Sequence, residues 1–521
     1  MPPPLANSLA VHLATALCRG QLGLAAPLIE VQVHLAPGLP TFHIVGLPAT
    51  AVRESKERVR AALENCGFEF PAGRITVSLA PADLPKDGGR YDLPIAIGIL
   101  QASAQLRTGA EFGAPCELYG ELGLGGELRP VRGLLPAAAE ASRARHQILI
   151  PAANRGEALL VARAVDVHAL THLREVCALL GAARTRAGAS PGTIAGSDAA
   201  ASCSAPLPGD AFLDVADVRG QHLGKRALLV AAAGGHSMLL HGPPGAGKSM
   251  LAQRLPGLLP PLTHAEALEV AMVASASAAG FDPRSFGRRP FRAPHHTASA
   301  HAIVGGGPHA RPGEVSLAHK GVLFLDELPE FDRRVLEALR QPLESGNVAI
   351  SRARVQALYP AAFQLIAAMN PCPCGESAET GACRCTPAQI RAYRGRLSAP
   401  LLDRIDLHVS LARVAARDIT AGARSAPDSA QLAALVRCTR ERQLARRGKL
   451  NHELTPSELH LHAPLAHAAA RLLEQAFEQL QLTARSYHRL LRVARTLADL
   501  DGSDAVELAH VAEAVQLRRE P

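Results

Sequence analysis

The string GPPGAGKS at residues 242–249 is the strongest constraint on this chain, because it fits the phosphate-binding loop pattern G-x-x-x-x-G-K-[ST] at every fixed position. A strand-like run at 237–240 precedes it, and a helix-compatible run at 250–255 follows it. Such a loop turns backbone N–H groups toward phosphate oxygens at a helix N-terminus, whose dipole favours negative charge. The predicted nucleotide-binding residues are Gly242, Pro243, Pro244, Gly245, Ala246, Gly247, Lys248 and Ser249.

A second string, VLFLDE at residues 322–327, is an apolar strand that ends in two acids. Lys248 is expected to reach the β- and γ-phosphates, and the Ser249 hydroxyl is expected to ligate Mg²⁺. Asp326 would hold the metal and its water, while Glu327 is placed to polarise the attacking water. The two strings together predict an ATP-hydrolysing enzyme that uses ATP and Mg²⁺.

Length and composition set wider bounds. A chain of 521 residues is long enough for about three domains at roughly 150 residues each. Its net charge of +8 is compatible with nucleic-acid binding, although Arg-rich solvated helices would give the same balance. No apolar run reaches the length of a membrane span, and the N-terminus lacks the basic flank of a signal peptide. A cytoplasmic protein without a membrane partner is therefore expected.

The sequence divides into three blocks and a linker. Residues 1–187 alternate short strands with helices, including a charged amphipathic helix at 51–65. Residues 188–209 are small and polar without hydrophobic periodicity, which predicts a flexible linker. Residues 210–412 hold the nucleotide motifs within β–α alternation, and 425–521 are predicted to be helical throughout. The expected fold class is α/β, with a parallel sheet in the nucleotide-binding block.

Further motifs follow in order along the chain and carry a family resemblance. They are FRAPHHTAS at 291–299, VGGG at 304–307, GEVSLAHKGVLFLDELPEF at 313–331, ISRA at 350–353, AAMNPCPCG at 367–375, LLDRIDLHV at 401–409 and ARSYHRLLRVARTLADL at 484–500. With these runs, the chain resembles the YifB/ComM family of magnesium-chelatase-like AAA+ ATPases over essentially its full length. The resemblance implies a P-loop AAA+ core with a parallel sheet and an all-helical C-terminal lid.

The resemblance also assigns roles to three polar residues. Asn370, at the end of a predicted strand, would be sensor 1, and Arg485 would be sensor 2, contacting the γ-phosphate from the lid. Arg404 would be an arginine finger that enters the neighbouring subunit's site, which implies a homo-oligomeric ring, expected to be a hexamer. The alternative for Arg404 is a surface ion pair with Asp403 or Asp406.

Two segments are candidates for contact with a substrate in the ring's pore. The stretch between Ser249 and Asp326 is longer than one crossover requires, and its glycines Gly305, Gly306 and Gly307 would interrupt a helix. In the resembled family this surplus is an insert that points into the pore. Residues 346–358 predict a hairpin in which Arg352 and Arg354 could touch DNA phosphates. Alternatively, Arg352 senses nucleotide across the subunit interface, or the hairpin is simply solvated.

Two groups of potential metal ligands need separate accounts. Cys372, Cys374, Cys383 and Cys385 form two C-x-C pairs that could supply a tetrahedral site for structural Zn²⁺. Unmetallated thiols and redox-active disulfides are the alternatives. His295 and His296 are adjacent and are expected to point in different directions, which favours packing or hydrogen bonding over metal binding.

The N-terminal block resembles the Lon-type protease domain (the ribosomal S5-type α/β fold) around its two catalytic positions. The matching segments are residues 85–96 and 126–135, which place Ile95 at the serine position and Leu135 at the lysine position. An isoleucine cannot attack a carbonyl, and a leucine cannot accept a proton. A Lon-like domain without peptidase activity is therefore expected.

The family resemblance favours a ring-shaped DNA motor, a helicase that promotes branch migration of recombination intermediates during natural transformation. Single-stranded or branched DNA would be its partner. The alternatives are an AAA+ protein remodeller, a chelatase-like metal-insertion motor and an ATP-dependent protease. The missing nucleophile argues against the protease, and the large Lon-like block argues against the metal-insertion motor.

Overall fold

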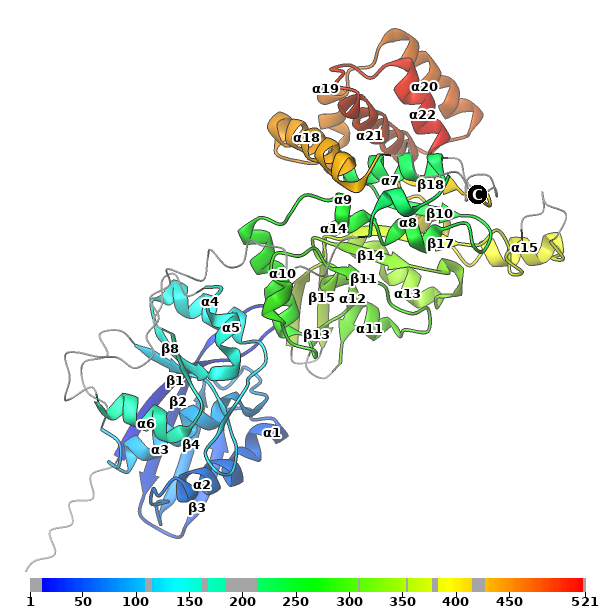
Figure 1. Cartoon of the computed structure of the whole chain (residues 1–521). Coiled ribbons are helices and arrows are strands. Elements are labelled where there is room, and N and C mark those ends of the chain that lie inside the picture. Colours follow the sequence, from blue (N-terminus) through cyan, green and yellow to red (C-terminus); the bar gives the residue numbers. More distant parts are fainter. Residues whose placement is uncertain are drawn as a thin grey trace, which may run out of the picture.

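The structure is a computed structural model that describes residues 12–107, 115–161, 167–182, 213–307, 310–352, 355–376, 383–414 and 427–518. An N-terminal α/β domain, a central α/β domain and a C-terminal helical domain follow one another in space as they do along the chain (Figure 1). The predicted linker at 188–209 and Arg354 lie outside the described residues.

Seven strands in the described part of the N-terminal domain form one mixed sheet, in the order β3-β4-β2-β1-β5-β8-β9. Strands β1, β2 and β4 pair antiparallel, whereas β3 and the β5–β8–β9 side pair parallel. Along β2 the buried residues Ile29, Val31 and Val33 alternate with more exposed polar ones, as expected for one covered sheet face. The strands are β1 (His12–Arg19), β2 (Leu28–Ala36), β3 (Thr41–Val45), β4 (Arg74–Ala80), β5 (Cys116–Leu118), β8 (Gln147–Pro151) and β9 (Val167–Leu170).

Helices cover this sheet, together with a short hairpin, β6 (Glu121–Leu122) and β7 (Leu128–Arg129). The helices are α1 (Thr50–Arg53), α2 (Ser55–Asn65), α3 (Asp92–Ala102), α4 (Leu134–Ala144), α5 (Arg155–Ala158) and α6 (Leu173–Ala182). The single helix predicted at 51–65 is divided at Glu54. Because Glu54 keeps helical backbone angles (φ −69°, ψ −18°), α1 and α2 run almost continuously.

The central domain is built on a parallel sheet with the strand order β11-β14-β17-β10-β18. Its core strands are apolar and buried except for His241 at the end of β10 and Gln364 at the start of β17, as expected when helices cover both faces. The strands are β11 (Phe291–Arg292), β14 (Val322–Leu325), β17 (Gln364–Met369), β10 (Met238–His241) and β18 (Leu407–Ser410). The prediction of a parallel-sheet α/β core is confirmed.

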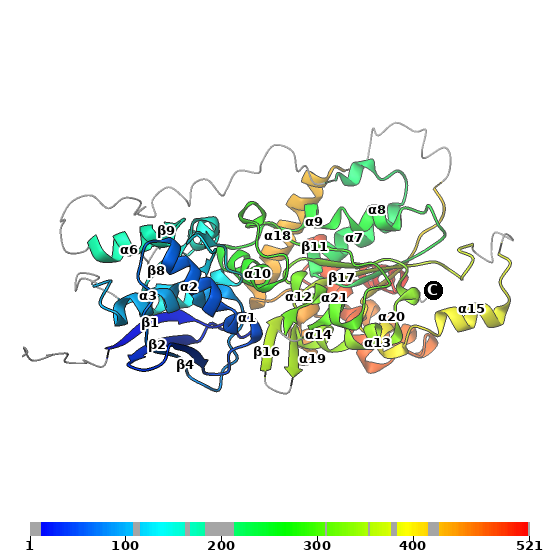
Figure 2. The same cartoon turned by 90° about the horizontal axis from the view of Figure 1, so that it is seen from below.

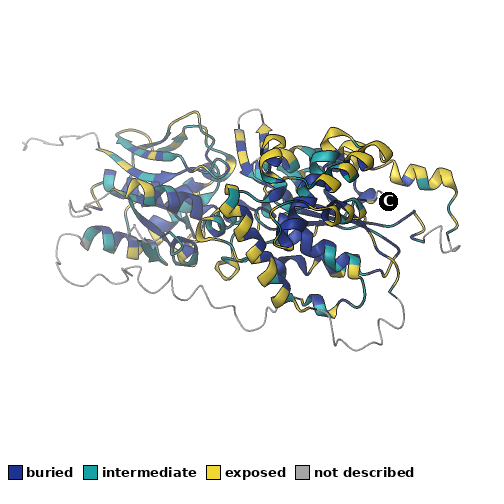
Figure 3. Ribbon diagram, turned by 90° about the horizontal axis from the view of Figure 1, so that it is seen from above, coloured by how far each residue is buried: buried dark blue, intermediate teal, exposed yellow. Residues whose placement is uncertain are grey.

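Helices and two hairpins complete the central domain. The helices are α7 (His222–Gly234), α8 (Lys248–Ala252), α9 (Leu255–Leu258), α10 (His264–Ala276), α11 (Ala300–Val304), α12 (Glu314–Leu317), α13 (Arg333–Ala338), α14 (Arg340–Ser345), α15 (Pro387–Arg394) and α16 (Ala399–Leu402). The hairpins are β12 (Gly305–Gly306) with β13 (Arg311–Pro312) and β15 (Asn347–Arg352) with β16 (Val355–Pro360). Helix α15 is largely exposed and projects from the rest of the domain (Figures 1 and 3).

The C-terminal domain is helical, as predicted, but it does not have a core of its own. Its helices are α18 (Ser429–Arg447), α19 (Pro456–His462), α20 (His467–Gln479), α21 (Ala484–Leu500) and α22 (Leu508–Gln516). Buried residues of α18, α21 and α22 form one continuous hydrophobic cluster with those of α7, β10 and β18. The predicted capping box of α19 is present, since Thr455 and Glu458 cap each other's backbone amides.

The N-terminal domain is fastened to the central domain through helix α10. The Gly133 amide donates to the Ser275 carbonyl at 3.0 Å, and the Ser275 hydroxyl donates to the Glu157 carboxylate at 3.1 Å. A second contact joins the turn at Gly23 to Ala357 of the β15–β16 hairpin, where an added Cβ would come within 3.1 Å. Figure 2 shows this hairpin beside the N-terminal domain. The two domains therefore meet at two separate places.

Candidate functional site

The loop at 242–247 connects β10 to α8 at the carboxyl end of the parallel sheet, where ligands of such folds bind. Gly245 (φ +76°) and Gly247 (φ +88°) adopt left-handed backbone angles that favour glycine. A Cβ on Gly242 would come within 2.4 Å of the Leu411 carbonyl oxygen. The glycines of the motif are therefore required by the backbone path of the loop itself.

Lys248 is nearly buried and bridges this loop to the neighbouring strand. Its ammonium donates to the carbonyls of Gly242 (2.6 Å) and Pro243 (3.0 Å) and to Oδ1 of Asn370 (2.9 Å). Burial lowers the pKa of Lys248, and the nearby Asp326 and Glu327 carboxylates raise it. The structure thus brings together the predicted phosphate-binding lysine and the predicted sensor 1.

Ser249 and Asp326 provide adjacent oxygens on the other side of the loop. The Ser249 hydroxyl donates to Asp326 Oδ2 at 2.7 Å, and Asp326 Oδ1 accepts from the Glu327 amide at 2.9 Å. A hydroxyl and a carboxylate are hard oxygen ligands of the kind Mg²⁺ takes alongside phosphates and waters. This pair of residues fits a magnesium site.

Glu327 is turned out of strand β14 by a left-handed backbone angle (φ +53°). Its carboxylate lies 3.2 Å from Nδ1 of His296, in the segment that follows the neighbouring strand β11. His296 in turn packs against His295, with ring centroids 4.1 Å apart and the rings tilted by 33°. The prediction that the two histidines point in different directions is wrong, because the loop after β11 brings both rings to one side. Hydrogen bonding is confirmed for His295, whose Nδ1 lies 2.9 Å from Thr297 Oγ1.

Arg404 lies at the opposite end of the sheet from the P-loop of its own chain. Strands β10 and β18 are parallel, with the P-loop after the carboxyl end of β10 and Arg404 before the amino end of β18. At about 3.3 Å per residue, strands of this length separate the two ends by roughly 10 Å or more. In this chain Arg404 is therefore held away from its own P-loop.

The guanidinium of Arg404 is nearly buried and held by two partners. It donates to the Pro400 carbonyl at 2.5 Å and pairs with the Glu344 carboxylate. The alternative of an ion pair is confirmed, but the expected partners Asp403 and Asp406 are wrong, because Arg404 pairs with Glu344. Asp403 accepts from Ser486 at 3.3 Å, and Asp406 is bound by Arg489 at 2.6 Å. Glu344 comes from α14, which lies 60 residues away in the sequence.

Arg485 is exposed in the first turn of α21, and that turn lies beside Arg404. The adjacent Ser486 donates to Asp403 at 3.3 Å, and Arg489 donates to the Arg404 carbonyl at 2.9 Å. The structure therefore places Arg485, the predicted sensor 2, beside Arg404, the predicted arginine finger, at the amino-terminal ends of the parallel strands. Within one chain it does not bring Arg485 to Lys248.

The two candidate pore segments are both hairpins. Gly305 (φ +103°) and Gly306 (φ +143°) pair antiparallel with residues 311–312, and a Cβ on Gly305 would come within 2.6 Å of the Arg311 carbonyl oxygen. Gly307 (φ +79°) follows them. The predicted second hairpin is present over 347–360, with Arg352 at the end of β15; the side chain of Arg352 lies outside the described part of the structure.

Three family models match the chain. The model described as Magnesium chelatase, subunit ChlI matches residues 214–419. The model described as Subunit ChlI of Mg-chelatase matches 31–154, and the one described as Magnesium chelatase, subunit ChlI C-terminal matches 426–518. Each matched range lies within one of the three domains, and the range 31–154 leaves out β1, β9 and α6 of the N-terminal domain.

Relatives match over almost the whole length. YifB of Salmonella typhimurium is 46% identical over 513 residues, which cover 98% of this chain and 97% of YifB. The competence protein ComM of Haemophilus influenzae is 46% identical over 508 residues, which cover 98% of both chains. The chain belongs to the YifB/ComM family. By contrast, the magnesium-chelatase subunit ChlI of rice (Oryza sativa subsp. japonica) is 24% identical over 228 residues, 42% of this chain.

In this YifB/ComM protein the N-terminal domain offers no protease nucleophile at the predicted positions. Ile95 and Leu135 are both fully buried. The nearby Asp92 is committed to structure, because it accepts from Ser55 at 2.5 Å and from Arg58 at 2.7 Å. Burial raises the pKa of Asp92, and these two donors lower it. Around Ile95 and Leu135 the side chains are therefore buried, and the nearby carboxylate of Asp92 is used for hydrogen bonds within the domain.

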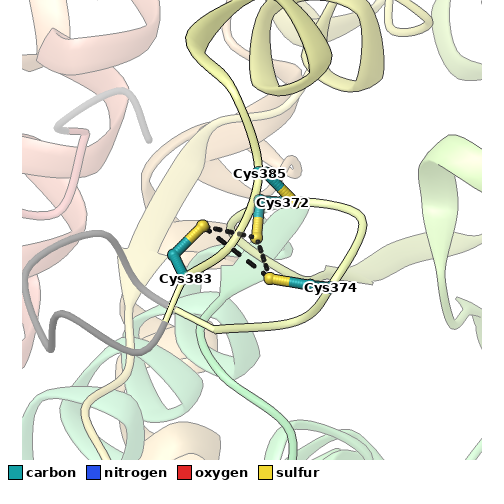
Figure 4. A group of neighbouring side chains, drawn as sticks. All are labelled: Cys372, Cys374, Cys383 and Cys385. Atoms are coloured by element: carbon teal, nitrogen blue, oxygen red, sulfur yellow. Dashed lines mark hydrogen bonds between the residues drawn. The ribbon is translucent and has the colours of Figure 1, made fainter.

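The four clustered cysteines converge in this YifB/ComM protein. Their sulfur atoms all lie within 4.8 Å of one another, and every cysteine in the described residues is a free thiol (Figure 4). The cluster begins two residues after Asn370, so it directly adjoins the nucleotide site.

No described helix has the length and apolarity that crossing a membrane would require.

Three contacts of the site were not predicted from the sequence. They are His296 with Glu327, Arg404 with Glu344, and the Tyr393 hydroxyl with the Asn370 backbone amide. His296 lies within the motif FRAPHHTAS, so the sequence marked this residue but did not indicate its contact with Glu327. Glu344 and Tyr393 gave no signal, because their spacing from Arg404 and Asn370 follows no helical or strand period.

Proposed function

We propose that this chain is the subunit of an ATP-driven ring, a hexamer, that translocates on single-stranded or branched DNA. In this proposal its work is branch migration of recombination intermediates during DNA uptake and integration. The observation that carries the ring is the separation of Arg404 from the P-loop of the same chain. The 46% identity to the competence protein ComM supports the process, and the net charge of +8 is compatible with a DNA partner.

The chemistry follows from the arrangement of the site. Ser249 and Asp326 would hold Mg²⁺, which supplies positive charge to the phosphate oxygens. Lys248 binds the same phosphates, and the Glu327 carboxylate accepts a proton from the attacking water. His296 holds Glu327 in place, and Asn370 orients the water from the neighbouring strand tip.

The site is finished by a second copy of the chain. Arg404, with Arg485 beside it, would approach the γ-phosphate bound by the adjacent subunit and stabilise the charge of the transition state. To do so, Arg404 leaves the Glu344 carboxylate that holds it in the single chain. Assembly and hydrolysis are then linked, because a lone subunit lacks both arginines at its own P-loop.

The DNA contacts belong to the same proposal. Gly305–Gly307 and the β15–β16 hairpin with Arg352 and Arg354 would face the central channel, where arginine binds phosphates without regard to sequence. A structural Zn²⁺ at the four cysteines completes the set of cofactors.

The decisive experiment measures ATPase rate with and without forked DNA, on protein whose mass is followed by light scattering. We expect DNA to raise the rate of the wild type and Lys248→Ala to abolish it, together with unwinding of a branched substrate. A rate raised by unfolded protein but indifferent to DNA would replace the DNA motor with an AAA+ protein remodeller. Turnover that depends on a porphyrin would instead favour the metal-insertion motor, as suggested by the distant similarity to rice ChlI.

A further inference from the structure

The four cysteines lie on a single loop that leaves the nucleotide site and returns to it. Cys372 follows strand β17 just beyond Asn370, and Cys385 immediately precedes Thr386, the N-cap of α15. The two C-x-C pairs come together although residues 377–382 separate them, and those residues lie outside the described part of the loop. Figure 4 shows the sulfurs of Cys372, Cys374 and Cys383 facing one another, with Cys385 beside Cys372.

The distances between three of the thiols are close to those of a tetrahedral metal site, and the fourth sulfur lies within 4.8 Å of the others. The Cys372 sulfur lies 3.1 Å from that of Cys374 and 3.5 Å from that of Cys383, and Cys374 and Cys383 are 3.7 Å apart. Four sulfurs bound at about 2.3 Å to one Zn²⁺ would be separated by roughly 3.8 Å. Disulfide-bonded sulfurs, by contrast, are only about 2.05 Å apart. Four thiolates with no open position favour zinc as a structural ion over a hard cation such as Mg²⁺.

The loop needs a cross-link because it buries little apolar surface. In the stretch 383–396 only Tyr393 is buried, and α15 exposes most of its residues. A segment that orders without a hydrophobic core must offset its conformational entropy by other bonds. Metal–thiolate bonds supply such a contribution, since binding free energy becomes folding free energy at a structural site.

The loop touches the nucleotide site at two points. Gly375 (φ +85°) lies against Pro244 of the P-loop, where an added Cβ would come within 2.8 Å of the proline ring. At its far end, the buried Tyr393 hydroxyl faces the backbone amide of Asn370. The loop therefore starts at Asn370, contacts the P-loop through Gly375 and Pro244, and contacts Asn370 again through Tyr393.

We propose that Cys372, Cys374, Cys383 and Cys385 bind one Zn²⁺, and that this ion positions Asn370 and Pro244 for ATP hydrolysis. The four cysteines are positioning residues, because none of them reaches the phosphates. Closing the loop fixes both of its contacts at once, so the metal acts on the ATP site through the protein. This inference rests on the ATPase part of the proposed function and is independent of DNA.

The first test is of the ion. The full-length protein, purified under reducing conditions without chelator, is expected to contain about one zinc per subunit by elemental mass spectrometry. Exchange with Co²⁺ should give the visible absorption bands of a tetrahedral thiolate site. Cys374→Ser and Cys383→Ser should lose both signals, whereas Cys438→Ser should keep them, since Cys438 is an exposed thiol in α18. Protein without zinc, without the cobalt bands, or with disulfides among these cysteines would overturn the assignment.

The second test is of the consequence. Metal-depleted protein and Cys383→Ser are expected to lose about tenfold or more in ATPase turnover, because small displacements of a positioned group have large effects on rate. Adding Zn²⁺ back should restore the depleted wild type and leave Cys383→Ser unchanged. Turnover indifferent to zinc, in protein that does bind it, would overturn the positioning role. If the wild type hydrolyses no ATP at all, the proposed function fails, while the cobalt spectrum still decides the site.

Discussion

Arg404 is paired with Glu344 near the amino-terminal ends of the parallel strands, whereas Lys248 of the same chain lies at their carboxyl ends. Arg404 and Lys248, which the proposed ring would bring together from adjacent copies of the chain, therefore lie at opposite ends of one sheet. This relationship gives the strongest test of shared sites, because two different inactive variants can repair each other.

Arg404→Ala and Glu327→Gln are each expected to lower ATP hydrolysis, the former by about 10³-fold or more. In rings that contain both variants, some interfaces combine an intact Glu327 with an intact Arg404. An equal mixture should therefore recover a measurable fraction of wild-type turnover in a coupled ATPase assay. A mixture no more active than its components would show that the finger acts within its own subunit. Arg437→Ala, on the exposed surface of α18, is the control for loss of a charge.

Binding and hydrolysis should separate between Lys248 and Glu327. Lys248→Ala removes the ammonium that bridges the loop to Asn370, so ATP binding itself should be lost. Glu327→Gln keeps the shape of the site and removes the base, so ATP should still bind while turnover falls about 10²-fold or more. Fluorescent-nucleotide titration and steady-state ATPase assays measure the two effects. Equal loss of binding in both variants would contradict the roles assigned to them.

His296 should act through Glu327. Its Nδ1 lies 3.2 Å from the Glu327 carboxylate, so His296→Ala is expected to lower kcat about tenfold and to leave the KM for ATP nearly unchanged. His296→Gln keeps a hydrogen-bond donor and should recover part of kcat. A rise in KM at constant kcat would indicate instead that His296 contributes to nucleotide binding.

The junction between the N-terminal and central domains should depend on pH. Burial raises the pKa of Glu157 from 4.5 to about 7, and its Ser275 and Leu135 donors lower it. Because the native state holds this proton more tightly than the unfolded chain, stability falls as pH rises from about 4.5 to about 7 and is flat above. The full effect is at most about 3 kcal/mol.

Glu157→Gln should remove this dependence and raise the thermal stability at pH 8, since the amide oxygen can still accept from Ser275. Melting temperatures at pH 5.5 and pH 8, measured by calorimetry, provide the comparison. The same slope in Glu157→Gln as in the wild type would place the titrating group elsewhere. Glu478→Gln, exposed in α20, is the matched control.

Local pattern predicted the parts of the fold that depend on local sequence. The apolar runs at 238–240 and 322–325 became buried parallel strands, and Thr455 with Glu458 capped α19. The predicted glycine-rich loop between β10 and α8 is also present, because the glycine spacing there is dictated by the backbone path.

Contacts between distant segments escaped prediction for a physical reason. His296 reaches Glu327 only because β11 and β14 are neighbours in the sheet, and Glu157 reaches Ser275 across 118 residues. No periodicity carries such information. The placement of Arg485 beside Arg404 likewise depends on where the helical domain packs, which its own sequence does not state.

The hydrophobic cluster that runs from β10 and β18 through α7 into α18, α21 and α22 bears on how such a machine would move. Close-packed interiors resist deformation and shift as units. A hinge between the ATPase core and its helical cap would have to open that interior to water. In the proposed ring, conformational changes driven by nucleotide would then be rotations of whole protomers against one another. The interfaces that move would be those where Arg404 exchanges Glu344 for the site of the adjacent subunit.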